Sequence, residues 1–251
     1  MKRRNRRSSK PRRNALVRKS RRQAWLERLE ERRLLTSSNG YLQVALAADQ
    51  SGAALVQDAN AQNPWGIALA PGGGPLWAVG SGSGIATRYL GDVTGGAFTA
   101  DPPDVTVPGT APTAIVFNPT LDFVVGSGND ALPALFLFAS QDGTISGWAS
   151  TPTFSSQAQT AVTVSGAEFT GLAVAVNGTN SQLYAADFHN AKIDVFNGSF
   201  QAATLAAGAF TDPNLPAGYA PYNIQLVGNQ LYVTYALQNN TQTAPETGAG
   251  N

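Results

Sequence analysis

The sequence contains no cysteine, and histidine is almost as scarce. The absence of cysteine excludes a disulfide framework, a thiolate nucleophile and a cysteine-ligated zinc or iron–sulfur site. The one histidine, His189, has no G-x-S-x-G segment or other nucleophile signal to accompany it, which argues against a catalytic triad. Apolar runs are short as well, and none approaches the roughly 18 consecutive residues of a transmembrane helix.

Charged residues are also sparse, at 13% of the chain, against about 25% in an average soluble protein. Glycine and proline are abundant, with 26 and 15 residues. Because these two residue types favour turns and interrupt long elements, the composition predicts short strands joined by many turns. The length of 251 residues fits one large all-β domain or two small ones.

The charges are distributed unevenly along the chain. Fifteen of the 17 lysines and arginines lie between Lys2 and Arg33, which leaves only Arg88 and Lys192 in the rest of the chain. Residues 36–251 carry these 2 positive charges and 13 negative ones, a net charge of −11. Because nucleic-acid binding needs lysine and arginine to neutralise phosphates, we expect no nucleic-acid binding by this acidic part.

The basic leader divides into two segments. Residues 1–22 are too charged and too poor in apolar residues to fold alone, whereas apolar residues three or four apart predict a short amphipathic helix within residues 24–35. Residues 26–35, LERLEERRLL, resemble the LEPR-XLL motif near the N-termini of large bacterial surface proteins, with Arg28 where proline is usual. The resemblance implies export to the cell surface; nucleic-acid or anionic-membrane binding and an inert basic tail are the alternatives.

A repeat of about 50 residues follows the leader. Residues 77–89, 136–148 and 184–196 align without a gap, and each segment begins and ends with an aromatic residue. The leucines that precede these segments, and a fourth, are 59, 48 and 48 residues apart: Leu76, Leu135, Leu183 and Leu231. A second matching strand begins upstream of each leucine, near Gly66, Ala114, Gly171 and Asn223. Regular spacing of this kind predicts a repeat architecture.

Each unit contains turn chemistry between its apolar runs. Asp142-Gly143 is a strong hairpin signal, so a unit is predicted to be a strand, a loop, a second strand, a tight turn and a third strand, with a fourth available. Antiparallel four-stranded units of this size, arranged around an axis, form a β-propeller. The prediction is therefore all-β: a partial propeller over residues 39–238, between a leader at 1–38 and a polar tail with an interrupted blade at 239–251.

The third unit, residues 171–196, resembles an NHL repeat, and the other units are weaker versions of it. Four phrases, at residues 63–68, 142–148, 184–190 and 219–225, resemble in order a family of uncharacterised secreted bacterial NHL-like β-propeller proteins, often with PEP-type C-terminal sorting signals. The resemblance implies six blades in the full family, of which this chain would hold about three and a half. We therefore expect a truncated fragment with an open ring, a frayed last unit and self-association.

Propellers bind ligands at the mouth of the central channel, where loops of successive blades converge. The residues predicted there are Asn63, Trp65, Asp142, Asp187, His189, Tyr222 and Asn223. Oxygen ligands favour Ca²⁺ or Mg²⁺, with Asp187 and His189 as candidate metal ligands; the alternative for His189 is a turn residue bonded to backbone. The recurring aromatic residues are predicted to pack between blades: Trp77, Phe136, Trp148, Tyr184, Phe196 and Tyr232.

Two functions fit these observations. The first is a secreted or cell-surface module that binds or displays, with a surface protein or a glycan as partner. The second is a divalent-metal-dependent hydrolase or lyase with its site at the channel mouth. Scarce histidine, absent cysteine and the lack of clustered carboxylates favour the binding module.

Overall fold

The computed structural model describes residues 43–91, 97–152, 155–178 and 180–248. Internal contacts divide the chain into two units, Met1–Gln43 and Val44–Asn251. The second unit holds every described strand. The predictions for the leader, disorder over residues 1–22 and a helix within 24–35, lie outside the described residues.

The described part of the chain confirms the all-β class. Its single helical element is a short 3₁₀ turn, η1 (Gly128–Asp130), and nothing in these ranges forms a helix long and apolar enough to cross a membrane. Two small pairs accompany the main sheets: β1 (Ala47–Ala48) runs parallel to β2 (Val56–Gln57), and β9 (Val124–Val125) runs antiparallel to β10 (Leu132–Pro133).

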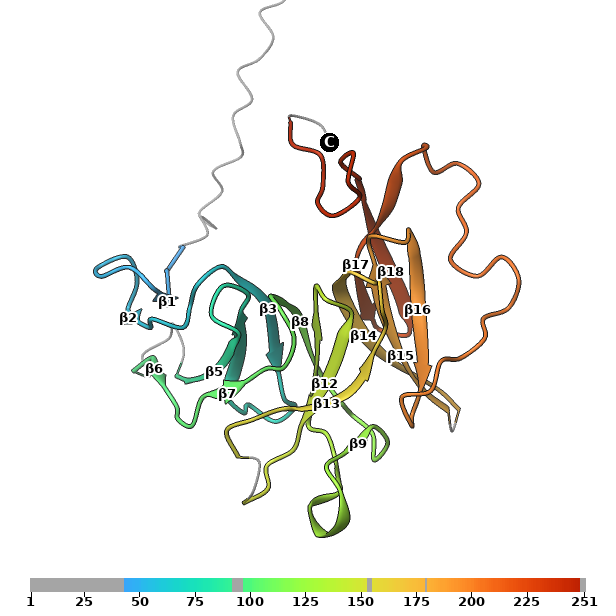
Figure 1. Cartoon of the computed structure of the whole chain (residues 1–251). Helices are drawn as coiled ribbons and strands as arrows, with labels where there is room; N and C mark the ends of the chain where they lie inside the picture. The colour runs from blue at the N-terminus through green and yellow to red at the C-terminus, as the bar shows by residue number, and fades with distance from the viewer. Residues whose placement is uncertain (1–42, 92–96, 153–154, 179, 249–251) are drawn as a thin grey trace, which may run out of the picture. The chain divides into compact units, whose positions relative to one another are not determined.

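Four antiparallel sheets follow one another along the chain (Figure 1). Sheet I contains β3 (Pro64–Leu69), β4 (Leu76–Gly80), β5 (Ile85–Leu90), β6 (Thr99–Ala100) and β7 (Val105–Thr106). Sheet II contains β8 (Pro112–Phe117), β11 (Phe136–Ser140), β12 (Thr144–Trp148) and β13 (Gln159–Thr163). Sheet III contains β14 (Phe169–Asn177), β15 (Asn180–Asp187) and β16 (Lys192–Asn197), and sheet IV contains β17 (Tyr219–Val227) and β18 (Gln230–Leu237). We call the first strand of each sheet, β3, β8, β14 or β17, its lead strand.

The strand pairs at the start of each predicted unit are confirmed. Every lead strand pairs antiparallel with the strand that contains or directly follows the repeated leucine. The tight turn predicted at Asp142-Gly143 joins β11 to β12. Gly143 has a φ of 76° there, and a Cβ at this position would lie 2.2 Å from the Val164 carbonyl oxygen, so only glycine fits.

Aromatic side chains fill the space between consecutive sheets. The Trp77 ring of sheet I lies 4.6 Å from the Phe136 ring and 4.9 Å from the Trp148 ring of sheet II, measured between centroids. Phe169 and Phe196 belong to the cluster shared by sheets II and III, and Ile224 of sheet IV packs among residues of sheet III. Burial at these contacts is what holds neighbouring sheets together, because apolar area removed from water stabilises packing.

The prediction for Tyr232 is wrong. Its side chain is 55% exposed, whereas the other five recurring aromatic residues are buried. In β18 the even-numbered residues from Gln230 to Thr234 face away from sheet III, and the odd-numbered Leu231 and Val233 pack against it. Sheet IV has no further sheet on that outward face among the described residues, so the repeat position alone does not bury the ring.

The lead strands at the two ends of the series differ from those in the middle. Ile67 and Leu69 of β3 are 65% and 58% exposed, while the corresponding parts of β8 and β14 are largely buried. The hydrophobic clusters join sheet I to II, II to III and III to IV. β3 therefore presents apolar side chains to solvent on the wall that it shares with the other lead strands.

Candidate ligand-binding site

The four lead strands line a cavity of about 470 Å³. Each contributes a stretch of backbone and aliphatic side chains, including Ile67, Ile115, Val174 and Ile224. The polar side chains on this wall are Thr113 from β8 and Asn223 and Gln225 from β17, and polar atoms account for much of the exposed lining. A cavity that combines aliphatic side chains with a few convergent polar side chains can accommodate an organic ligand.

Each lead strand carries an irregularity at the same point near its beginning. One residue in each strand is left out of the register with the second strand: Trp65, Thr113, Thr170 and Tyr222. Such a bulge leaves the extra residue unpaired and redirects its side chain. The four sheets thus each place a bulged residue where the lead strand begins, and two of these residues, Trp65 and Thr113, line the cavity.

The two threonines among these residues form hydrogen bonds that stabilise sheets II and III. The Thr113 hydroxyl donates to the Phe169 carbonyl oxygen at 2.6 Å, which links sheet II to the start of β14. The Thr170 hydroxyl is 3.5 Å from the Ala186 carbonyl oxygen within sheet III. Both side chains are buried, and their hydroxyl groups are satisfied by backbone acceptors, as buried polar groups require.

The two aromatic residues meet each other. The Trp65 and Tyr222 rings lie 6.0 Å apart between centroids and are tilted by 45°, although one comes from the first sheet and the other from the last. Phe188, from the turn after β15, packs edge-on against Tyr222 at 5.4 Å. Trp65 and Tyr222 are both half-buried, so their rings remain accessible on one side to a ligand.

Glu168 adds a carboxyl group at the same end of the molecule. It directly precedes β14, and its backbone N–H donates to Asp187 Oδ1 at 3.1 Å. Burial raises the pKa of the Glu168 carboxyl, nearby Asp187 raises it further, and His189 opposes the shift. The pKa of Tyr222 is raised by burial and by the negative charge of Glu168.

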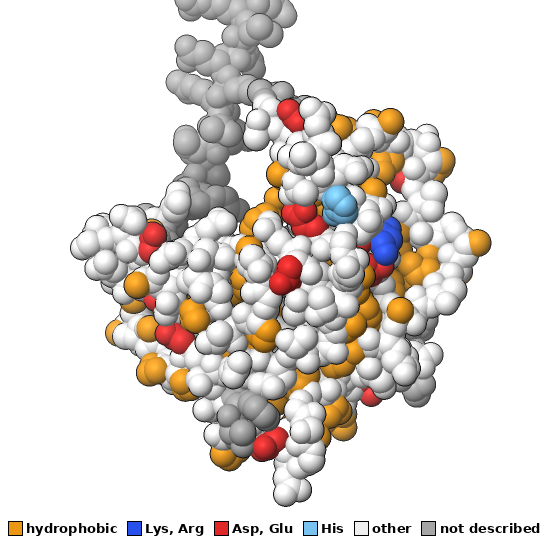
Figure 2. Space-filling view, in the orientation of Figure 1, with side chains coloured by type: hydrophobic (Ala, Val, Ile, Leu, Met, Phe, Trp, Pro, Cys, Tyr) orange, Lys and Arg blue, Asp and Glu red, His pale blue; other side chains and the backbone are white. Residues whose placement is uncertain are grey.

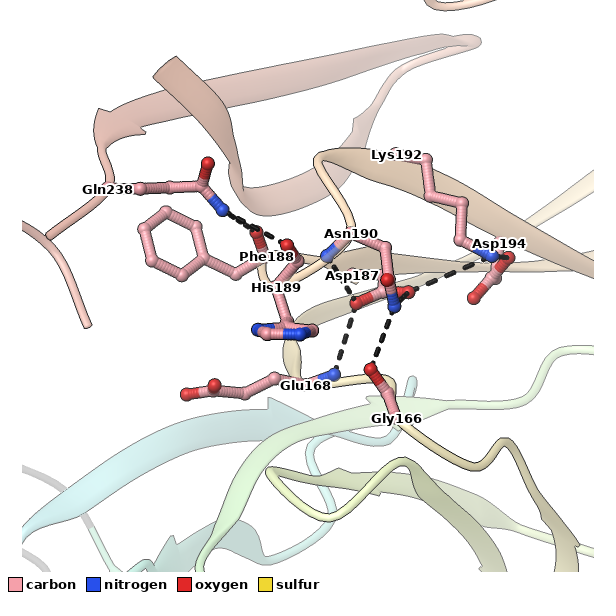
Figure 3. Close-up of polar contacts among 9 residues, drawn as sticks. All are labelled: Gly166, Glu168, Asp187, Phe188, His189, Asn190, Lys192, Asp194 and Gln238. Carbon is pink, nitrogen blue, oxygen red and sulfur yellow. Dashed lines mark hydrogen bonds and ion pairs between the residues drawn. The ribbon is translucent and has the colours of Figure 1, made fainter. Parts of the chain in front are cut away.

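The sequence prediction missed Glu168. Its only sequence signal is its position immediately before a predicted lead strand, and nothing in the local pattern distinguishes it from an ordinary solvated acid. Its proximity to His189 arises only when the turn after β15 folds against the residues before β14 (Figure 3).

Asp187 organises the turn between β15 and β16 (Figure 3). Its side chain is fully buried, and its oxygens accept hydrogen bonds from the backbone N–H of Asn190 at 3.2 Å and from the Asn190 side-chain amide at 2.8 Å. Lys192 Nζ lies 3.8 Å from Asp187 Oδ2. With the bond from Glu168, both carboxylate oxygens are engaged by groups of the chain itself.

His189 lies in that turn beside the predicted polar tail. Its Nδ1 is 3.3 Å from the Gln242 carbonyl oxygen. The Gln238 side-chain amide donates to the carbonyl oxygens of Phe188 and His189, at 2.5 and 3.2 Å. The segment after β18 therefore folds back onto the turn of sheet III, and His189 has the backbone contact that its turn interpretation predicts.

The other predicted residues occupy separate positions. Asn63 precedes β3 with a φ of 46°, and its carbonyl accepts a bond from Ser81. Asp142 accepts bonds from the backbone N–H groups of Thr110 and Thr144. Of the seven residues predicted at the channel mouth, Trp65 and Asn223 line the cavity, and Tyr222 packs on Trp65.

The predicted metal ligands were Asp187 and His189. Within the described ranges no group of three or more histidine, aspartate or glutamate side chains is placed to hold a metal ion. Asp187 is already saturated by hydrogen bonds from the chain. Calcium takes about six to eight oxygen ligands, so the metal hypothesis stays a prediction that this pair of residues supports weakly.

Comparison with known proteins identifies viral relatives. No protein-family model matches the chain. An uncharacterised protein of Acanthamoeba polyphaga mimivirus is 31% identical over 218 residues, which are 82% of this chain and 51% of the relative. A second uncharacterised protein of the same virus is 29% identical over 209 residues, covering 75% of this chain and 51% of the relative. The chain thus spans about half the length of these relatives.

Among solved structures, a Bacteroides uniformis protein assigned as a 6-phosphogluconolactonase matches with a TM-score of 0.45 at 14% sequence identity. The match covers 82% of this chain and 57% of that protein.

Proposed function

We propose that the protein is a non-catalytic binding module that takes its ligand at the cavity between the lead strands. In this proposal the four sheets are successive blades of an open, NHL-like β-propeller, as the repeat spacing predicts. The partner is a surface protein or a glycan. Export of the module to the surface of a bacterial cell rests on the leader motif alone, because the viral relatives do not bear on it.

The observation that carries the proposal is the set of four matched bulges. Backbone pairing is lost at the same place in every lead strand. Two of the redirected residues are large aromatic side chains that meet each other, and one of them, Trp65, lines the cavity. Bulges are enriched next to binding sites because they re-aim side chains. Half-buried tryptophan and tyrosine supply contact area at low entropic cost.

The binding module has better support than the metal-dependent hydrolase or lyase. That alternative needs Asp187 and His189 to be free for an ion, whereas Asp187 is fully buried and supports the turn. The Trp65 and Tyr222 rings contact each other, and both residues remain partly exposed.

The test is a binding screen of the full chain against arrays of glycans and surface polypeptides. We expect a ligand whose binding is lost in Trp65→Ala and Tyr222→Ala but largely kept in Trp65→Phe. Trp77→Phe is the matched control, since Trp77 is 2% exposed in the core. A ligand bound equally by all variants, or chelator-sensitive hydrolysis of esters or lactones, would contradict the proposal. Protease accessibility of the module on intact cells tests export separately.

A further inference from the structure

A second pocket of about 480 Å³ lies at the far end of sheet III from the Asp187 turn. It is formed by the loop after β8, the first residues of β15 and the turn after β16. The side chains that line it are all polar: Asp122, Asn180, Ser181, Gln182, Asn197 and Ser199. The cavity that the four lead strands line shares none of these residues.

Several polar groups of this pocket have no partner within the described part of the chain. Ser181 is only 6% exposed, yet its hydroxyl makes no hydrogen bond there, and neither does the Asp122 carboxylate. Gln182 accepts a bond from the Tyr184 hydroxyl at 2.7 Å, which leaves its side-chain N–H groups available. The Ser181 hydroxyl oxygen is not one of the fully buried side-chain atoms without a partner in the described part of the chain, so it is accessible from the pocket and can bond to a ligand there.

Two residues in strained backbone conformations hold together the two loops that form the pocket. Phe123 and Phe200 have φ values of 60° and 59°, in the left-handed region that bulky residues rarely adopt. Their rings pack edge-on at 5.4 Å between centroids, and the Phe123 N–H donates to the Gly198 carbonyl oxygen at 2.7 Å. These contacts hold the Asp122 loop of sheet II against the turn of sheet III. Strain of this kind persists where the surroundings enforce it, and it clusters at functional sites.

We propose that this pocket binds a neutral sugar through adjacent hydroxyl groups. A sugar hydroxyl both donates and accepts hydrogen bonds, and the pocket offers a carboxylate acceptor, amide groups and serine hydroxyls. The single carboxylate disfavours an anion and supplies too little charge for a calcium site. The polar lining disfavours an apolar ligand. Without an aromatic side chain in the lining, we expect a dissociation constant of roughly millimolar order.

The test uses the full chain and three probes: methyl β-glucoside, methyl β-galactoside and methyl α-mannoside. Saturation-transfer NMR is expected to detect at least one of them. Asp122→Asn should weaken binding at least about tenfold, because hydrogen bonds to charged groups are the stronger ones, and Ser181→Ala by about three- to tenfold. Asp130→Asn removes the same charge outside the pocket and should leave binding unchanged.

Thermal unfolding of each variant shows whether it is folded. If Asp122→Asn does not fold, Ser181→Ala alone tests the proposal. Absence of saturation transfer to all three glycosides would overturn the proposal. So would sugar binding that both pocket variants retain, or sugar binding lost in Trp65→Ala instead. Calorimetric binding of Ca²⁺ that is abolished in Asp122→Asn would identify a cation site and overturn the sugar assignment.

Discussion

Asp187 shows what a single buried carboxylate contributes. It accepts bonds from two backbone N–H groups and one side-chain amide while being fully buried. We predict that Asp187→Ala lowers the free energy of unfolding by about 2–4 kcal/mol, because several buried donors lose their acceptor. Asp142→Ala is the control, since Asp142 makes similar turn bonds but is exposed. Urea unfolding measures the free energy of unfolding of both variants. An equal loss of stability in the two would contradict the structural role assigned to Asp187.

Glu168 has a different effect on stability, because burial raises its pKa. A folded-state pKa above the unfolded value means that the folded protein holds the proton more tightly, so ionisation of Glu168 destabilises the fold as pH rises through that pKa. Glu168→Gln should therefore raise the melting temperature modestly at pH 8. At pH 4, where the carboxyl is largely protonated in the folded protein, we expect this gain in melting temperature to shrink. An equal gain at both pH values would show that the carboxyl charge is not the cause.

At the level of elements, the strands were predictable and the bulges were not. The repeated leucines and aromatic residues indicate where strands begin, and the structure has antiparallel pairs at all four places. A bulge depends on the register between two strands, which single-strand alternation does not encode. The meeting of Trp65 with Tyr222 depends on packing across the whole series of sheets, so the sequence indicated both residues but not their contact.

The turn between β11 and β12 gives an element-level prediction. A Cβ at Gly143 would lie 2.2 Å from the Val164 carbonyl oxygen at a φ of 76°, so Gly143→Ala should destabilise by at least about 2 kcal/mol through strain and overlap. Gly74→Ala is the matched control, since a Cβ there meets nothing closer than 3.5 Å and no left-handed φ is needed. Differential scanning calorimetry compares them, and similar melting temperatures would argue against the turn geometry.

Across the whole module, acidic side chains far outnumber basic ones. Arg88 and Lys192, the basic residues after the leader, are both paired with acids: Arg88 with Asp101, and Lys192 with Asp194 and Asp187. Figure 2 shows one face on which acidic side chains are scattered among uncharged ones, with few basic groups. Because the leader is strongly basic, two forces favour association between molecules: charge attraction and burial of exposed apolar side chains.

These two forces give different predictions for association. Ile67 and Leu69, 65% and 58% exposed on β3, present an apolar edge that burial would stabilise. We therefore predict concentration-dependent association of the full chain, measured by light scattering, that increases with sulfate salts because these strengthen apolar burial. The double variant Ile67→Lys, Leu69→Lys should be largely monomeric. Leu121→Lys, at a loop residue that is 86% exposed, should associate like the unmodified chain. Association that sodium chloride abolishes would instead identify leader charge as the cause, since salt screens charge attraction.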